Sequence, residues 1–219
     1  MRGFPIILSA PSGGGKTAIT HRLLAERADL GYSVSCTTRA PRPGEVDGRD
    51  YHFLTPAEFA ARRERGEFAE SATVHGRLYG TLRSEVERVM AQGKHVVMDI
   101  DVQGAAQVRS AFPQSVSIFV LPPSGDALLA RLRARQTESA ETLSTRLASA
   151  LRELDAVPAY QYVVVNDVLD RAVEGVSRII DAEGHRRDRL ENLENDVRSI
   201  IERLQHEITG SANLSSKAE

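Results

Sequence analysis

The residues best suited to chemistry lie near the start of the chain, in a segment rich in glycine. Residues 9–17 read Ser-Ala-Pro-Ser-Gly-Gly-Gly-Lys-Thr, between the apolar residues 4–8 and a helix-like stretch over 18–27. Glycines let backbone N–H groups close around phosphates, and the positive end of a following helix favours the anion. Lys16 can reach the outer phosphates and the Thr17 hydroxyl can bind Mg²⁺. We therefore expect a strand, a phosphate-binding loop and a helix that bind a nucleoside triphosphate.

The expected ligands from this loop are Ala10, Pro11, Ser12, Gly13, Gly14, Gly15, Lys16 and Thr17. Ala10 departs from the pattern G-x-x-x-x-G-K-[ST], which has glycine at the first position. We expect the loop to tolerate this methyl group, because bound phosphates lie nearer to Gly13 and Lys16.

A second group of polar residues follows in a proline-stiffened loop. Arg39 and Arg42 lie beside Pro41 and Pro43, and Tyr51 comes soon after them. Guanidinium groups bind phosphate through paired N–H donors, and a tyrosine hydroxyl can add another donor. Arginines in loops are commonly solvated. Because the chain also contains a phosphate-binding loop, these residues are candidates for binding the substrate that accepts the phosphate.

Short apolar runs predict the element that positions these groups. The runs are 6–8, 96–98, 118–121 and 163–165. Strands that are apolar on both faces and separated by helical patterns are typical of a parallel sheet covered by helices on both sides. We therefore predict a three-layer α/β fold.

Capping signals predict where several helices begin and end. Thr55-Pro-Ala-Glu58 has the form of a capping box, and that helix should stop at Gly66. A helical pattern from about Leu82 ends at Gly93, and Ser124 can cap another helix. The core sheet is expected to carry two insertions, at about residues 35–92 and about 133–148.

Composition limits the remaining classes of function. The chain has 219 residues, 41% of them hydrophobic, a net charge of −2 and one cysteine, Cys36. The charge disfavours nucleic-acid binding through overall basicity, and one cysteine excludes an intrachain disulfide. Without a signal peptide or an apolar run long enough to span a membrane, we expect a cytoplasmic enzyme with no membrane partner.

Seven segments along the chain form a distinctive ordered set. They are 9–17, Ser35-Cys-Thr-Thr-Arg-Ala-Pro-Arg-Pro-Gly-Glu45, Asp47-Gly-Arg-Asp-Tyr-His-Phe53, Phe68-Ala-Glu70, Leu78-Tyr-Gly-Thr81, Asp99-Ile-Asp-Val-Gln-Gly104 and Val165-Asn-Asp167. In this order they resemble the guanylate kinases, which transfer phosphate from ATP to GMP. The resemblance implies a P-loop kinase fold over 1–183, in which the first insertion binds GMP and the second forms a helical lid.

The resemblance also implies roles for individual residues. Positions that hold the GMP phosphate are matched by Arg39, Arg42, Tyr51 and Tyr79, and positions that read or support guanine by Ser35, Glu70, Thr81 and Asp101. Guanine offers N1–H and an amino group as donors, so carboxylates and hydroxyls suit its edge. Adenine presents the wrong edge, and a polar site left unpaired can reject it by as much as ~10⁴.

Further positions match the ATP side of the family. Asp99 is expected near Mg²⁺, either as a direct ligand or through water, and Asn166 near the ATP base and ribose. Arg131, Arg135 and Arg146 match the lid, where arginines neutralise charge on a transferring phosphoryl group. Together with Lys16, Arg39 and Arg42, these lid arginines form the expected catalytic set.

Two alternatives stay open at this point. A kinase of the same architecture could act on another phosphorylated acceptor, such as a ribose bisphosphate, but it would not need Ser35, Glu70 and Asp101 together. A non-enzymatic scaffold module would be expected to have lost the phosphate loop or the lid arginines. Both are present here.

The C-terminal part of the chain extends beyond the resemblance. Over 184–209, Leu190, Leu193, Val197, Ile200 and Leu204 recur at intervals of three and four residues. This spacing predicts an amphipathic helix that packs on its own domain or joins two copies of the chain in a homo-oligomer. The polar residues 210–219 are expected to be disordered.

Overall fold

A five-stranded parallel sheet forms the centre of the protein. The structure, a computed structural model, describes residues 3–74, 76–134 and 140–215. The strand order is β2-β7-β1-β8-β9, and every neighbouring pair is parallel. The strands are β1 (Pro5–Ser9), β2 (Leu30–Tyr32), β7 (His95–Asp99), β8 (Val116–Leu121) and β9 (Tyr162–Val165). All four predicted strands are confirmed, and only the three-residue β2 had no recognisable apolar run.

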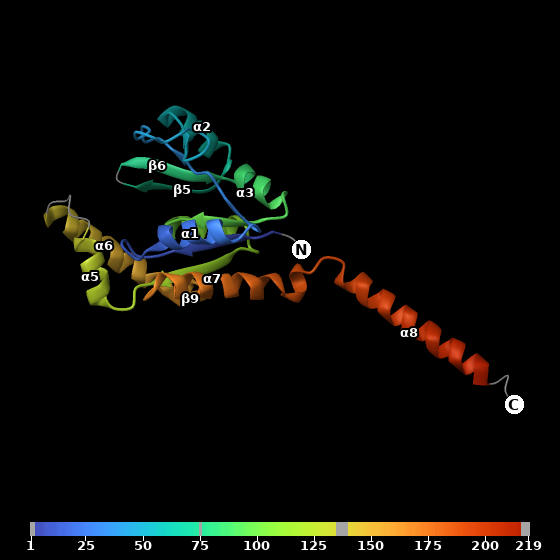
Figure 1. Cartoon of the computed structure of the whole chain (residues 1–219). Coiled ribbons are helices and arrows are strands. Elements are labelled where there is room, and N and C mark those ends of the chain that lie inside the picture. Colours follow the sequence, from blue (N-terminus) through green and yellow to red (C-terminus); the bar gives the residue numbers. More distant parts are fainter. Residues whose placement is uncertain (1–2, 75, 135–139, 216–219) are drawn as a thin grey trace.

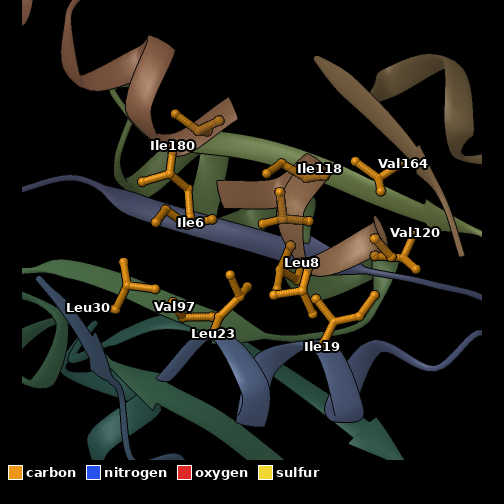
Figure 2. Close-up of a cluster of buried hydrophobic side chains, with 14 of the residues drawn as sticks. Ile6, Leu8, Ile19, Leu23, Leu30, Val97, Ile118, Val120, Val164 and Ile180 are labelled. Carbon is orange, nitrogen blue, oxygen red and sulfur yellow. The ribbon is translucent and has the colours of Figure 1, made fainter. Parts of the chain in front are cut away.

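Helices cover both faces of this sheet, which confirms the three-layer α/β prediction. On one face, α1 (Lys16–Glu26) and α7 (Leu169–Gly184) bury side chains such as Ile6 and Leu8 of β1. Figure 2 shows Ile19 and Leu23 of α1 and Ile180 of α7 around these residues. On the other face, α3 (Arg83–Met90) and α4 (Val102–Ala111) cover an apolar cluster that includes Ile7 and Met98.

The first insertion contains a sheet of its own. Its strand order is β4-β3-β6-β5, and its strands are β3 (Cys36–Thr37), β4 (His52–Phe53), β5 (Phe68–Val74) and β6 (Arg77–Leu82). Cys36, Phe59 and Phe68 form a small core beneath α2 (Pro56–Glu64). The expected end of this insertion, at about residue 92, differs from the structure, because Val86 and Val89 of α3 are buried in the main core.

The predicted caps are present. Thr55 and Glu58 form a reciprocal capping box at the start of α2, and the Ser124 hydroxyl accepts the Ala127 N–H. Gly66 and Gly93 follow their helices with φ of 69° and 74°, a left-handed conformation that glycine adopts at little cost.

Two helices flank the predicted lid. They are α5 (Gly125–Arg133) and α6 (Ala140–Asp155), and α6 leads through the short turn η1 (Val157–Ala159) into β9. Both helices extend past the expected bounds of 133–148 and share a small core that includes Leu128, Leu132 and Ala150. The residues of this core lie on both sides of the predicted lid in the sequence, because the apolar stripes of the two helices must cover each other.

The C-terminal segment differs from the prediction in its bounds. The helix expected over 184–209 starts only at Leu193, after the turn η2 (Arg187–Arg189), and α8 (Leu193–Ser215) continues into residues expected to be disordered. Figure 1 shows α8 extending away from the rest of the chain. Within the described residues, none of the helices combines the length and apolar character needed to cross a bilayer.

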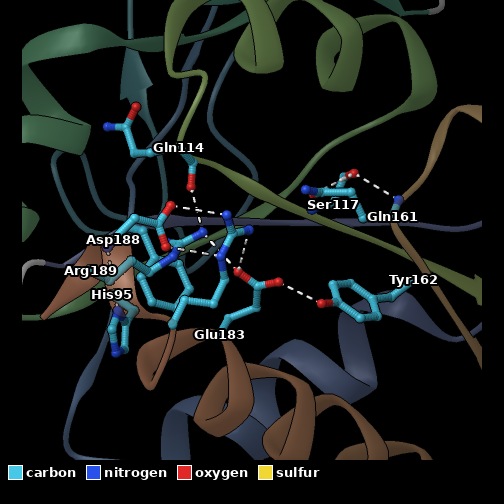
Figure 3. A network of polar contacts seen from close by, with 10 residues as sticks. His95, Gln114, Ser117, Gln161, Tyr162, Glu183, Asp188 and Arg189 are labelled. Carbon is cyan, nitrogen blue, oxygen red and sulfur yellow. Dashed lines mark hydrogen bonds and ion pairs between the residues drawn. The ribbon is translucent and has the colours of Figure 1, made fainter.

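A buried polar network attaches the segment after α7 to the N-terminal edge of the main sheet (Figure 3). The Glu183 side chain is 4% exposed and accepts from Arg189 Nη2 at 2.9 Å. It also accepts from the Tyr162 hydroxyl of β9. The Arg189 guanidinium lies 4.0 Å from the centre of the Phe4 ring and donates to the Gln114 carbonyl. The network therefore ties α7 and η2 to β1, β8 and β9.

Removing the Glu183 carboxylate should destabilise the domain far more than removing an exposed carboxylate of the same helix. Glu183→Ala leaves the Arg189 charge without its buried partner, a loss that costs about 3–5 kcal/mol. Glu174→Ala, which breaks the exposed pair with Arg178, should cost less than about 1 kcal/mol. Urea unfolding of both variants measures the difference, and equal losses would show that the network does not brace the fold.

Candidate active site

The glycine-rich loop connects β1 to α1 as predicted, and glycine is required at specific positions in it. Gly13 and Gly15 have φ of 82° and 90°, in the left-handed region that other residues adopt only with strain. A Cβ on Gly15 would also lie 2.3 Å from Asn166 Nδ2. The loop can therefore take this shape only with glycine at these positions.

The alanine that departs from the loop pattern fits the structure. Ala10 is buried against the main core, and a Cβ on Gly14 would lie 2.8 Å from the Ala10 methyl. The missing side chain at Gly14 thus makes room for the extra methyl at Ala10.

Lys16, Thr17 and Asp99 meet at the C-terminal edge of the parallel sheet. Leu8 of β1 is in register with Asp99 of β7, so the start of α1 lies beside the Asp99 carboxylate. Lys16 Nζ is 2.6 Å from Asp99 Oδ1, and the Thr17 hydroxyl donates to Asp99 Oδ2 at 2.9 Å. A hydroxyl and a carboxylate side by side are oxygen ligands of the kind that Mg²⁺ uses beside phosphates.

Two predicted site residues hold the loop backbone. Asn166 follows β9, and its side-chain N–H donates to the Gly14 carbonyl at 2.9 Å. Arg131 of α5 donates to the same carbonyl at 3.4 Å and to the Asn166 carbonyl at 2.8 Å. Both side chains therefore touch the loop directly, whereas the sequence placed Arg131 in a lid and Asn166 near a base.

A buried carboxylate lies at the centre of the second group of predicted residues. Glu70 of β5 is in register with Thr81 of β6, and the Thr81 hydroxyl donates to Glu70 Oε1 at 2.8 Å. The hydroxyls of Ser35 and Thr81 are 3.2 Å apart. A Cβ on Gly104 would lie 2.9 Å from Glu70 Oε2, so this glycine lets the carboxylate reach α4.

Burial dominates the electrostatics of Glu70. Desolvation raises its pKa to about 7, the nearby Asp101 carboxylate adds to the rise, and Thr81 and Lys16 oppose it. The opposing contribution of Lys16 means that the carboxylate lies within electrostatic reach of the phosphate loop. Asp101 itself caps α4 by accepting the Gly104 N–H at 2.7 Å. Together these residues offer acceptors suited to a planar group rich in N–H donors.

The loop that carries Arg39 and Arg42, called the arginine loop below, lies beside Tyr51, which precedes β4, and Tyr79 of β6. Tyr51 and Tyr79 have ring centres 6.0 Å apart, and the Arg39 guanidinium lies 5.4 Å from the centre of the Tyr51 ring. Arg39 is paired with Glu45 at 2.8 Å, and Glu45 also accepts the Arg42 backbone N–H at 2.7 Å. Glu45 thus shapes the loop, although the sequence analysis gave it no role.

Two lid predictions have different outcomes. Arg135 lies outside the residues that the structure describes. Arg146 is on α6 and half-buried, and its role in the lid stays a prediction. Gly104 and Glu45 lie in the segments that resemble the guanylate kinases. Apart from that position, nothing in the sequence indicates that they support Glu70 and the arginine loop.

Comparisons with known proteins agree with this geometry. Residues 2–183 match the family model described as guanylate kinase. A guanylate kinase of Nitrosospira multiformis is 48% identical over 177 residues, which cover 81% of this chain and 84% of that protein. One from Symbiobacterium thermophilum is 50% identical over 182 residues, which cover 83% and 86%. The crystal structure of guanylate kinase from Anaplasma phagocytophilum superposes with a TM-score of 0.73 at 33% identity, and the match covers 90% of this chain and 95% of that one.

Ionisation of Glu70 should make the free protein less stable as pH rises. Its folded pKa of about 7 lies above the ordinary value of 4.5, so the folded state holds a proton that the unfolded state releases. The resulting stabilisation is complete below pH 4.5 and is lost as pH rises through about 7, by up to about 3 kcal/mol. Urea unfolding between pH 5 and 8 measures it. Glu70→Gln should show a correspondingly flatter profile, and parallel profiles for the two proteins would contradict the assignment.

Proposed function

The chain belongs to the guanylate kinase family, whose members phosphorylate GMP with ATP, and on that premise we propose which of its residues bind each substrate. ATP binds to the loop from Ala10 to Thr17, and GMP binds between the arginine loop and the strand pair β5 and β6. We propose that ATP and GMP are its partners in the cytoplasm, without a nucleic acid or a membrane.

We assign the triphosphate to the loop because its glycine-rich backbone leads directly into the positive end of α1, where N–H groups favour an anion. Lys16 supplies the mobile positive charge for the outer phosphates. Thr17 and Asp99, 2.9 Å apart, would hold Mg²⁺ directly or through water. When bound, this cation neutralises phosphate charge and fixes the phosphate oxygens.

We assign guanine to the buried acceptors Ser35, Glu70, Thr81 and Asp101. As a carboxylate, Glu70 can accept from guanine N1–H while the Thr81 hydroxyl supports its other oxygen. The GMP phosphate lies with Arg39, Arg42, Tyr51 and Tyr79 in this assignment. Arg39 then exchanges its Glu45 partner, in whole or in part, for a phosphate oxygen.

The chemistry that follows is an in-line transfer. A GMP phosphate oxygen attacks the γ-phosphorus of ATP, and the bond from that phosphorus to the oxygen bridging the β- and γ-phosphates breaks. ADP and GDP result. The attacking oxygen is already anionic, so no strong general base is required, and catalysis consists of positioning and charge neutralisation. The positive charge comes from Lys16, Arg39 and Arg42. Arg131 of α5, Arg146 of α6 and Arg135, which lies between these helices in the sequence, add to it.

The observation that carries this proposal is the placement of Glu70. A carboxylate that is 6% exposed is costly unless it has a partner, and in the structure Glu70 accepts the Thr81 hydroxyl. Its pKa also responds to Lys16 of the phosphate loop. This coupling supports one site in which Glu70 reads the base and Lys16 binds the phosphates, as transfer between two nucleotides requires.

The acceptor assignment is tested by the substrates that the protein and its Glu70→Gln variant phosphorylate. The amide can turn a donor toward guanine N1–H, so kcat/KM for GMP should fall by roughly 10²-fold or more. AMP and a ribose bisphosphate should be poor acceptors for both proteins. A coupled assay with the three acceptors measures this, and Glu64→Gln, an exposed change on α2, is the matched control. A native protein that prefers AMP or the ribose bisphosphate to GMP would contradict the assignment.

We also propose that α8 joins two copies of the chain. Its apolar residues are exposed, from 45% at Val197 and 58% at Leu204 to 70% at Ile208. Val197 and Leu204 are seven residues apart, as are Ile201 and Ile208, which is the repeat of a coiled-coil seam. The match to the family model ends at residue 183, before α8 begins. A second α8 is the partner whose apolar stripe has the matching spacing.

Truncation after Glu191 should therefore convert the protein to a monomer that retains phosphoryl transfer. This end point keeps η2 and the Arg189 pair with Glu183, which a cut at residue 183 would destroy. In the full chain, Ile201→Asp with Leu204→Asp should have the same effect, while Ser199→Asp, off the stripe, should not. Light scattering gives the masses, and a monomeric native protein would refute self-association.

A further inference from the structure

A carboxylate that the sequence analysis did not select reaches the phosphate loop from α6. Glu153 lies near the end of this helix, and its Oε2 accepts the backbone N–H of Ser12 at 2.8 Å. The two residues are 141 positions apart in the chain. Ser12 lies at the entrance of the loop, before the glycines that turn toward the substrate.

Packing places α5 and α6 firmly against this loop. Leu128 and Leu132 of α5 share a core with Ala150 of α6, and Leu132 lies where a Cβ on Gly13 would be only 3.2 Å away. On the α5 side, Arg131 donates to the Gly14 carbonyl. Glu153 supplies the corresponding contact from α6. The loop is therefore held by a positive side chain from α5 and a negative side chain from α6.

The charge of Glu153 does not serve to attract the substrate. Burial is the main cause that raises its pKa, the Ser12 N–H and Lys16 oppose the rise, and Asp101 adds to it. A carboxylate within reach of Lys16 and Asp101 lies beside the place where a polyanion must bind, and like charges repel. Glu153 is suited to this position because its carboxylate accepts a strong hydrogen bond from the loop backbone.

We propose that Glu153 is a positioning residue for ATP, because its bond to the Ser12 N–H fixes the entrance of the phosphate loop and couples the loop to α6. The glycine-rich loop has little conformational preference of its own, and Ser12 precedes the first left-handed glycine. Loss of the bond frees the loop to adopt shapes that do not receive the phosphates. The inference rests on the proposed binding of ATP to this loop.

The test compares Glu153→Ala and Glu153→Gln with the control Asp155→Ala. The glutamine keeps a side-chain oxygen that can accept the Ser12 N–H but removes the charge. Asp155 is exposed on the same helix. Steady-state kinetics give kcat and KM for each nucleotide, titration gives the Kd for ATP, and thermal unfolding reports the stability of each variant.

For Glu153→Ala we expect the KM and Kd for ATP to rise by about tenfold, the loss that corresponds to one charge-assisted hydrogen bond. The KM for GMP should change by less than about twofold, because its assigned ligands lie on other elements. Glu153→Gln should restore ATP affinity to within about threefold of the native protein, because a neutral acceptor retains much of the bond. Asp155→Ala should behave as native.

Three results would overturn the proposal. They are an unchanged Kd for ATP in Glu153→Ala, a tighter Kd that shows the carboxylate to be an obstacle, and equal loss of both substrates in the alanine and glutamine variants. A purely structural role would lower the unfolding temperature without separating ATP from GMP. Lys16→Ala, measured in parallel, separates this failure from that of the proposed function. If ATP does not bind to the loop, the Lys16→Ala variant should keep its turnover, whatever the result for the Glu153 variants.

Discussion

The phosphate loop imposes the constraint on which the rest of the structure depends. Inside the loop the Gly14 N–H donates to the Pro11 carbonyl at 2.7 Å, but N–H groups that are offered to an anion cannot also hold the shape of the loop. Its glycines also remove the conformational preferences that side chains would give. Other elements must therefore hold it. Asn166 after β9, Arg131 of α5 and Glu153 of α6 each bond a loop backbone group. The main sheet, α5 and α6 therefore act together to hold the phosphate loop.

A second constraint is the cost of keeping an unpaired carboxylate away from water. Glu70 lies among hydroxyls and next to Gly104, and its nearest carboxylate neighbour, Asp101, makes ionisation harder. Such a group is stable mainly in its protonated form, or when a ligand supplies N–H donors. Binding energy for the correct base therefore includes relief of this cost. In the proposed assignment, the same residue that weakens the free protein above neutral pH selects the base.

The two edges of the parallel sheet have separate roles. Strands β1 and β7 deliver the loop and Asp99 to the C-terminal edge, where ligands of open α/β sheets bind. At the N-terminal edge, Glu183 and Arg189 attach the end of α7 to β1, β8 and β9 (Figure 3). The charges at the first edge belong to the proposed nucleotide site, whereas the buried charges of Glu183 and Arg189 at the second edge pair with each other inside the protein. Stability and activity can therefore be altered independently.

The sequence alone determined the local features of this protein. The β1 loop and α1, the four long strands, the capping box at Thr55 and the cap at Ser124 follow from glycine, proline and apolar patterns that act over a few residues. The resemblance to guanylate kinases placed Glu70, Thr81 and Asp99 in the site. The tertiary structure decided what depends on contacts between distant segments: the burial that raises the pKa of Glu70, the fit of Ala10 against Gly14, and the roles of Asn166 and Arg131 on the loop. It also decided the roles of Glu45, Glu153 and Glu183. A glutamate in a helix has the same local signal whether it faces water or another backbone, and only the packing of α6 and α7 distinguishes the two.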